Sequence, residues 1–143
     1  MDATKNSSDP DRERLQALAA FLPLFEAPGF EFGVWQGSRE LGPGHYTMPY
    51  FEPGKTALAF VQTTYAQNWV LRGWDWPAWT QTEEAVRLRD DPAALAAASA
   101  EQLAKLLTVL IRQDRFVEGG LDSAFESGLL TAIARRATVL AQG

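Results

Sequence analysis

The sequence predicts a mainly α (α+β) fold, a single-domain helical bundle of about five to six helices with a small β-hairpin near residues 30–48. Three observations predict it. Apolar residues recur at helical spacing along most of the chain, most clearly in residues 99–118. A segment rich in glycine and aromatic residues, 29–54, interrupts that pattern. The chain has 143 residues, 46% of them hydrophobic, which is enough for one ordinary domain with a core.

The chain begins with a polar stretch, MDATKNSSDP, that ends in proline. We therefore expect residues 1–10 to form a disordered N-terminal arm and residues 11–143 to form one globular domain. Residues 11–26 have leucines at helical spacing and predict the first helix. Pro23 should kink or end this helix, because proline lacks an N–H donor and clashes with the preceding turn.

The glycine- and aromatic-rich segment predicts the β-hairpin. Apolar and other residues alternate from Phe30 to Val34, which is typical of a short strand. A second strand near His45–Met48 could return against it, with LGPG (residues 41–44) as the loop. Two strands alone are marginal in water, so we expect them to lie on helices.

Two helices are predicted in the middle of the chain. Residues 55–67 form the first. Its apolar side chains form one stripe with two neighbours beside it: Leu58, Val61 and Tyr65, then Phe60 and Thr64. WVLRGWDWPAW (residues 69–79) is expected to be a loop that enters the second helix, which runs to about Leu88. Asp75 is a plausible N-cap, and Pro77 suits a first helical turn.

The clearest helix follows a short alanine-rich helix at residues 92–98. Ser99 and Gln102 have the spacing of a capping box, which marks a helix start. Five apolar residues then share one face: Leu103, Leu106, Leu107, Leu110 and Ile111. Gly119–Gly120 should end this helix, because glycine readily adopts the left-handed conformation found there. Two helices complete the chain, at residues 121–127 and 129–141, with Gly128 between them.

The composition restricts the possible functions. A formal net charge of −5 argues against a phosphate-backbone ligand, although a local basic face is compatible with it. The chain has no cysteine and one histidine, His45, so zinc sites and thiol nucleophiles are excluded and a serine triad would need His45. No segment has the length and apolarity of a membrane span or the pattern of a signal peptide. We expect a cytoplasmic protein with no membrane contact.

The tryptophan cluster is the first candidate site. Four tryptophans fall within eleven residues: Trp69, Trp74, Trp76 and Trp79. With Tyr50 and Tyr65 they could line a pocket for a flat or cationic ligand, with Asp75 as its polar anchor. The alternative is that these large rings fill the core of a small domain, and we favour that interpretation.

The arginine cluster is the second candidate site. Arg112 and Arg115 are three residues apart, so they share a helix face. They could clamp a phosphate or carboxylate with their planar guanidinium groups. They could instead latch neighbouring helices through four nearby acids, and we favour this: Asp114, Glu118, Asp122 and Glu126.

Two further interpretations of the C-terminal part receive less weight. Three of its acids recur every four residues and could hold a metal, but Gly119–Gly120 breaks that register. Ala124 and Gly128 imitate the turn of a helix-turn-helix. However, Ser127 and Thr131 stand where that motif wants apolar residues, and the basic pair Arg135–Arg136 falls late in the recognition helix.

Three motifs resemble an uncharacterised bacterial family of unknown function: MPYF at residues 48–51, DWPAW at 75–79, and KLLTVLIRQDRFVEGGLDSAFESGLLTAIARR at 105–136. The resemblance covers about residues 15–137, and the last motif is the specific one. It implies a shared tail made of Thr108, Arg112, Arg115, Phe116, Gly119, Leu121, Glu126 and Gly128. It implies no reaction or ligand. This chain departs from relatives at Val117, where some have a polar or cysteine residue, and at Trp74, where many have phenylalanine.

We therefore predict a non-enzymatic binding or protein-interaction module, because no nucleophile–base pair or phosphate-binding loop is visible. A protein partner or a homodimer would fit this class, and we predict no cofactor, no metal and no catalytic residue. The first alternative is an enzyme or small-ligand protein that uses seven residues: Trp74, Asp75, Trp76, Trp79, Arg112, Arg115 and Glu126. The second is a helix-turn-helix-like nucleic-acid binder. An interaction module needs an exposed apolar patch, whereas an enzyme needs a deep pocket with convergent polar groups.

Overall fold

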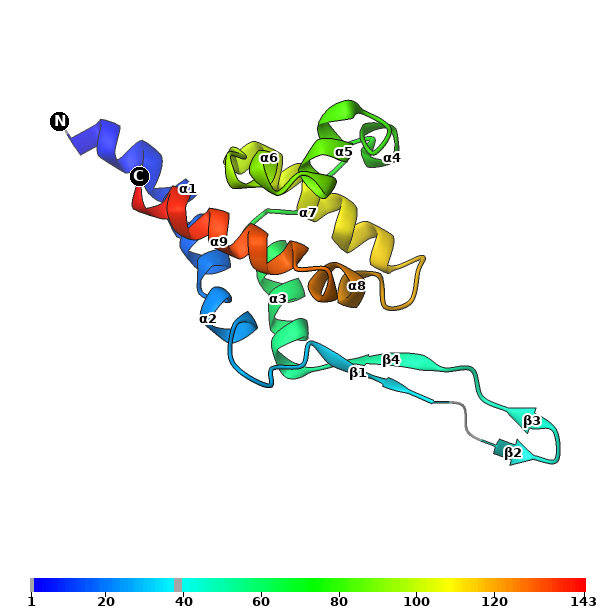
Figure 1. Cartoon of the computed structure of the whole chain (residues 1–143). Coiled ribbons are helices and arrows are strands. Elements are labelled where there is room, and N and C mark those ends of the chain that lie inside the picture. The colour runs from blue at the N-terminus through cyan, green and yellow to red at the C-terminus, as the bar shows by residue number, and fades with distance from the viewer. Residues whose placement is uncertain (1, 38–39) are drawn as a thin grey trace.

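The two long terminal helices, α1 and α9, lie side by side and hold the two ends of the chain together (Figure 1). The computed structural model describes residues 2–37 and 40–143, with side chains from residue 11 onwards. Its helices are α1 (Asp2–Ala19), α2 (Leu22–Phe25), α3 (Lys55–Ala66), α4 (Trp76–Trp79), α5 (Glu83–Asp90), α6 (Pro92–Ala96), α7 (Ala100–Asp114), α8 (Gly120–Glu126) and α9 (Leu129–Gln142). Its strands are β1 (Gly33–Gln36), β2 (Glu40–Gly42), β3 (His45–Tyr46) and β4 (Tyr50–Pro53). The predicted mainly helical class with small antiparallel strands is confirmed.

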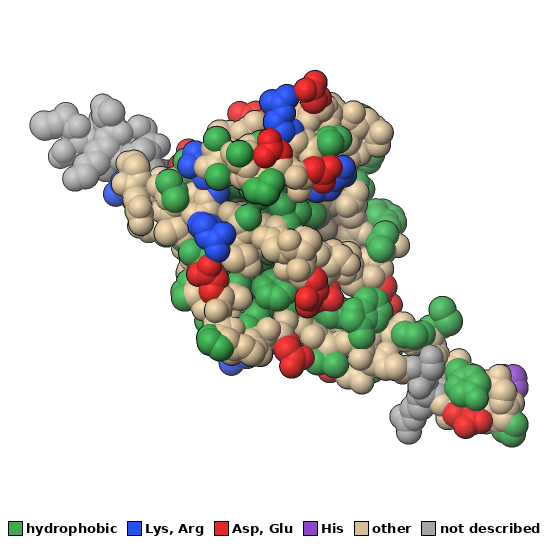
Figure 2. All heavy atoms as spheres, viewed as in Figure 1, with side chains coloured by type: hydrophobic (Ala, Val, Ile, Leu, Met, Phe, Trp, Pro, Cys, Tyr) green, Lys and Arg blue, Asp and Glu red, His purple; other side chains and the backbone are tan. Residues whose placement is uncertain are grey.

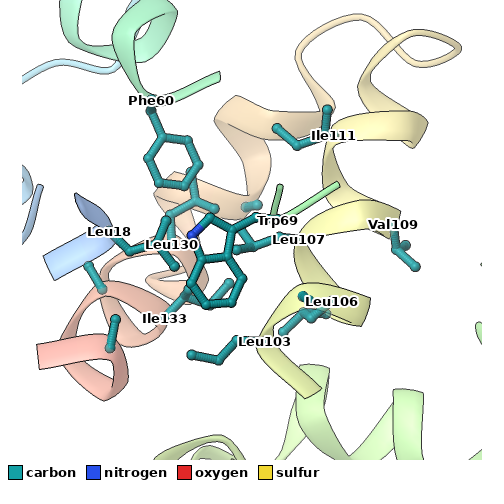
Figure 3. Packing of buried hydrophobic residues seen from close by; sticks show 14 of the residues in the cluster. Leu18, Phe60, Trp69, Leu103, Leu106, Leu107, Val109, Ile111, Leu130 and Ile133 are labelled. Carbon is teal, nitrogen blue, oxygen red and sulfur yellow. The ribbon is translucent and has the colours of Figure 1, made fainter. Parts of the chain in front are cut away.

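One hydrophobic core joins the helices, and Trp69 lies at its centre (Figure 3). The indole ring is fully buried. Side chains from four helices surround it: Leu18 of α1, Phe60 of α3, Leu103 and Leu107 of α7, and Leu130 and Ile133 of α9. Its ring nitrogen donates to the Arg14 carbonyl at 3.2 Å. One of the four clustered tryptophans is therefore a core residue, as the structural interpretation of that cluster expects.

Many helix boundaries follow the local signals, but several differ from the prediction. α1 begins at Asp2 and not at Asp11, and α7 ends at Asp114, before the Gly119–Gly120 pair that was expected to end it. The capping box of Ser99 and Gln102 is present at the start of α7. The first predicted helix, residues 11–26, is divided into two: α1 ends at Ala19, and Pro23 lies in the first turn of the separate helix α2. The helix expected to run to about Leu88 is also two helices, α4 and α5. Thr82 accounts for that break, because its side chain accepts from the Ala85 N–H and caps a new helix.

The predicted hairpin is present, but its strand pairing is different. β1 pairs with β4, so Gly33 lies opposite Pro53, and β3 near the expected second strand pairs with the short β2 instead. The hairpin is therefore longer than the one predicted near residues 30–48. The lack of a side chain at Gly33 allows this register. A Cβ at this position would lie 2.3 Å from the Phe51 ring.

The hairpin forms a two-stranded ribbon that projects from the helical body (Figure 1). Its outer end is the β2–β3 turn, and Gly44 has a left-handed φ of 77° there. Its inner end is tied to the body, where the Gly54 N–H donates to the Phe32 carbonyl at 2.9 Å. We call the described residues 33–37 and 40–53 the ribbon, and residues 40–48 its tip.

Two further sequence predictions concern the chain ends and membranes. The backbone of residues 2–10 forms the first part of α1, where the sequence predicts a disordered arm. The side chains of residues 1–10 lie outside the described part of the structure, so the division into an arm and a domain stays a prediction. Within the described residues, no helix combines the length and the apolarity that crossing a bilayer requires.

Candidate functional site

The tryptophans after Trp69 form a structural corner between α4, α5 and α7. The Trp74 and Trp79 rings pack together with centroids 5.5 Å apart. Trp79 is buried, and Trp74 and Trp76 are partly buried against the core. The exposed Asp75 caps α4 by accepting from the Ala78 N–H at 3.1 Å, as predicted. A hollow of about 50 Å³ beside Trp79 is far smaller than a typical small-molecule site.

Glu84 links this corner to α7. Its carboxylate accepts from Gln102 Nε2 at 3.0 Å and from the Trp79 indole at 2.7 Å. Lys105 Nζ lies 3.8 Å away. The hydrogen bonds from Gln102 and Trp79 lower the pKa of Glu84 below its ordinary value, because they favour the charged carboxylate. Sequence reasoning missed Glu84, because it placed this residue in the middle of one helix running to about Leu88, whereas Glu84 lies in the first turn of α5.

The arginine cluster does not form the predicted latch. Among the described residues, no ion pair joins Arg112 or Arg115 to the four nearby acids. Arg115 instead donates to the Tyr65 hydroxyl of α3 at 2.8 Å. One of the four acids does link two helices, without an arginine: Asp114 Oδ1 accepts a hydrogen bond from the Leu121 N–H at 2.9 Å. That bond ties the end of α7 to the start of α8.

Both arginines of α9 bind groups of the protein itself. Arg136 donates to the Ala98 carbonyl at 2.7 Å, and Arg135 pairs with Glu26. Leu130, in the first turn of α9, is fully buried, so this turn faces the core rather than a ligand. Glu126 is exposed at the end of α8. Within the described part of the chain, no three acidic or histidine side chains are grouped closely enough to hold a metal ion.

The face of α3 that the sequence marks as apolar is open instead of buried. Ala57, Phe60 and Thr64 are the buried residues of this helix. Two residues of the predicted stripe lie on the outside, with Leu58 51% exposed and Tyr65 38% exposed, whereas Val61 is partly buried against the core. Residues 57–61 are apolar without a break, so the core takes one side of the helix and leaves a second apolar side uncovered.

This open face forms one wall of a groove of about 380 Å³, which we call the α3 groove. The second wall is the base of the ribbon, and the third is the corner between α7 and α8. Its lining is Phe32, Phe51, Pro53, Ala57, Leu58, Val61, Gln62, Asp114, Glu118, Gly119 and Leu121. The volume falls in the usual range for binding sites. None of the seven residues predicted to bind a ligand is in this lining, so their role stays a prediction.

Only two lining residues of the α3 groove are charged, and both are acidic. Asp114 has one oxygen engaged with the Leu121 N–H. Glu118 is exposed and forms none of the ion pairs found among the described residues. Arg115 lies nearby but is held against Tyr65, with its guanidinium carbon 5.9 Å from the ring centroid. The groove therefore offers apolar walls and carboxylates to an occupant.

Gly119 places the ribbon against the α7–α8 corner. Its φ of 75° is left-handed, and a Cβ there would lie 2.2 Å from the Trp35 ring. The Trp35 ring also meets Phe51 edge-on, with centroids 5.5 Å apart. Gly119 was expected to end the helix before it, but α7 already ends at Asp114, and Gly119 instead precedes α8. It lets a tryptophan of the ribbon pack directly on the backbone beside the groove.

Exposed apolar side chains continue outward from the groove on the ribbon and on the α7–α8 corner: Val34, Trp35, Leu41, Tyr46, Met48, Tyr50, Phe116 and Val117. Figure 2 shows apolar side chains at the outer end of the ribbon, at lower right, clear of the body. Soluble monomers rarely expose contiguous apolar patches beyond a few hundred Å². One signal in the sequence, the unbroken apolar run on α3, pointed to this surface, but it did not indicate which side of the helix would stay open.

A larger hollow of about 640 Å³ lies between α5, α6 and α7, and its polar groups pair with one another. Arg87 is bound to Glu83 at 2.7 Å, and Glu84 is held by Gln102. Alanines form much of the remaining wall. Because these charged side chains already have partners, this hollow offers a ligand fewer free polar groups than the α3 groove does.

A family model matches residues 10–143 of the chain, nearly all of it. The chain belongs to the family of unknown function DUF6508. No curated protein and no solved structure matches it. The family resemblance seen in the motifs is thereby confirmed.

In this DUF6508 chain, residues of the implied family tail surround the α7–α8 corner. Thr108 is fully buried and joins α7 to the loop after α3, because its hydroxyl accepts from the Leu71 N–H at 2.9 Å. Gly119 and Leu121 line the α3 groove. Phe116 stands beside it, 78% exposed. The tail thus builds one wall of the groove as well as part of the core.

Proposed function

We propose that this protein is a protein-interaction module, and that the α3 groove binds an apolar polypeptide segment carrying a basic side chain. The observation that carries the proposal is the open apolar face of α3. Leu58 is half exposed on a helix whose other side is in the core, and the ribbon base completes an apolar trough beside it. Covering such a surface releases water and favours association.

The charge of the groove supports a basic occupant. Asp114 and Glu118 line it, and no cationic side chain does. A lysine or arginine among apolar residues would place its stem on the apolar walls and its charge beside these carboxylates. The overall net charge of −5 would assist the approach of such a segment.

Other observations favour binding over the two alternatives. Two residues of the enzyme hypothesis are held by structural partners: Trp79 donates to Glu84, and Arg115 donates to Tyr65. For the nucleic-acid hypothesis, the arginines of α9 are engaged with Glu26 and Ala98. The bacterial origin and the cytoplasmic location expected from the sequence form part of the same proposal.

The experiment is a peptide selection followed by titration. A displayed random-peptide library is selected on the wild-type chain, and enriched peptides are synthesised with a fluorophore for anisotropy measurements. We expect them to combine apolar residues with lysine or arginine. Leu58→Glu should weaken binding at least about tenfold, since it removes an apolar anchor and adds a charge. Glu118→Lys should weaken binding of the basic peptides and make it less sensitive to salt.

Val86→Glu is the matched control, because Val86 is 41% exposed on α5, away from the groove lining. It should bind the peptides like the wild type. Equal binding by the wild type, the Leu58 variant and the Glu118 variant would contradict the proposal, as would enriched peptides without basic residues.

A further inference from the structure

A second groove, of about 340 Å³, lies where α6 packs against α9, and we call it the α6–α9 groove. Its lining is Pro92, Ala96, Ala132, Arg135, Arg136 and Val139. A smaller hollow of about 150 Å³ shares Pro92 and Ala132 with it and continues it towards the start of α9. The main hollow alone falls in the usual range for small-molecule sites.

Helical spacing explains why this face of α9 is open and mostly apolar. Ala132, Arg136 and Val139 are four and three residues apart, so they lie on one face of the helix. Val139 is 51% exposed there. The core takes a different face of α9, whose buried residues are Leu130, Ile133, Ala134 and Ala137. This helix therefore has a second apolar face that the domain leaves uncovered.

Arg136 supplies a positive charge to the groove without a carboxylate partner. Its Nε donates to the Ala98 carbonyl at 2.7 Å, which fixes the orientation of the half-buried guanidinium group. Across residues 11–37 and 40–143, no hydrogen bond or ion pair uses its two Nη atoms. The other arginines of the two hollows are paired, Arg135 with Glu26 and Arg89 with Asp90.

We propose that the α6–α9 groove binds an aliphatic carboxylate, with the carboxylate on Arg136 and the hydrocarbon chain along the apolar wall. Two parallel N–H groups of a guanidinium can bind both oxygens of one carboxylate, and the Nη atoms of Arg136 provide them. The lining of the main hollow contains no acidic residue that would repel this ligand. This site is separate from the α3 groove and does not depend on the function proposed for it.

The walls favour a hydrocarbon chain over a polypeptide. Apart from the two arginines, the main hollow is lined by alanine, proline and valine. Both walls are helices, which use most of their N–H and C=O groups internally and offer few to a bound peptide backbone. Covering unpaired peptide groups is costly, whereas an aliphatic chain has none and gains from apolar contact along its length.

The length of the groove suits a medium-chain acid. The smaller hollow reaches Gly128, eight residues before Arg136, which corresponds to about 12 Å along α9. The affinity should therefore increase from hexanoate to decanoate, because each added methylene covers more of the apolar wall. The α3 groove would not accept these ligands in the same way, since its two charged lining residues are Asp114 and Glu118.

The test is isothermal titration calorimetry of the full chain with decanoate. We expect one site in the wild type. Val139→Glu should weaken binding at least about tenfold, because it places a negative charge on the wall, and Arg136→Met should do so by removing the guanidinium group. Val86→Glu is the matched control, since Val86 is 41% exposed on α5 and lines neither hollow. Decyltrimethylammonium, with the same chain and the opposite charge, should not bind at this site.

Circular dichroism establishes that each variant is folded. Val139→Glu keeps the bond between Arg136 and Ala98, so it tests the site even if Arg136→Met does not fold. The absence of decanoate binding to the wild type overturns the proposal, and so does equal binding by the wild type and Val139→Glu. Equal affinity for decanoate and decyltrimethylammonium also overturns it. Leu58→Glu should bind decanoate like the wild type, and a loss there would assign the ligand to the α3 groove instead.

Discussion

Replacing Gly119 by alanine tests how the ribbon is held against the helical body. Two costs are expected. A left-handed φ of 75° costs an L-residue about 1–2 kcal/mol. The new Cβ would also lie 2.2 Å from the Trp35 ring, and such overpacking costs typically about 1–3 kcal/mol. The free energy of unfolding should therefore fall by about 2–5 kcal/mol in total.

Gly128 provides the matched control. Its φ of 89° is also left-handed, and it also precedes a helix, but a Cβ there would meet nothing within 4 Å. Gly128→Ala should thus lose only the backbone part, about 1–2 kcal/mol. The difference between the two variants measures the contact with Trp35.

The assay is urea unfolding followed by circular dichroism at one protein concentration, for both alanine variants with and without Trp35→Ala. Removing the indole should relieve the steric part, so Gly119→Ala should cost about 1–2 kcal/mol in that background. The resulting coupling energy of about 1–3 kcal/mol should be absent for Gly128. Equal losses at the two glycines, or no coupling between Gly119 and Trp35, would refute the packing argument.

Three further predictions concern polar groups within the helical body. Thr108→Val should lower the free energy of unfolding by about 1–3 kcal/mol, because the Leu71 N–H loses its buried acceptor; an unchanged urea midpoint would contradict this. Ser99→Ala should cost about 1 kcal/mol by removing the capping box with Gln102, measured in the same way, and an exposed serine without a capping bond is its control. The pKa of Glu84 in the folded chain is below its ordinary 4.5, so its contribution to stability is present above pH 4.5 and is lost as the pH falls through the folded value. In Glu84→Gln, the free energy of unfolding should therefore fall less steeply than in the wild type as the pH drops below 4.5. Parallel curves of this free energy against pH for the two proteins would contradict the prediction.

Local sequence signals located most helix boundaries, because the interactions that set them span only a few residues. The side chains of Ser99 and Gln102 are three residues apart, and so are Asp75 and the Ala78 N–H that it caps. Each of these bonds forms within one helical turn whatever the rest of the chain does. The N-cap at Thr82 depends on an equally local hydrogen bond, so the start of α5 could have been predicted from the sequence, although it was not.

Features that depend on distant contacts did not follow from the sequence. The sequence predicted residues 45–48 as the partner of β1, and the observed pairing with β4 depends on how the Phe51 ring fits over Gly33, eighteen positions away. Arg115 had four acids close by in the sequence, yet its hydrogen-bond partner is Tyr65 in another helix. Proximity along the chain predicts contacts within a helix much better than contacts between helices.

The amino-acid sequence by itself determined a mainly helical domain, several of its helix ends and its family, because periodicity, caps and motifs are properties of short segments. Only the tertiary structure decided which side of α3 is covered. Its residues 57–61 are apolar on both sides, so the helix is equally suited to two orientations until its neighbours pack. The core encloses Phe60 and leaves Leu58 in an open groove beside the ribbon, and that choice creates the candidate site.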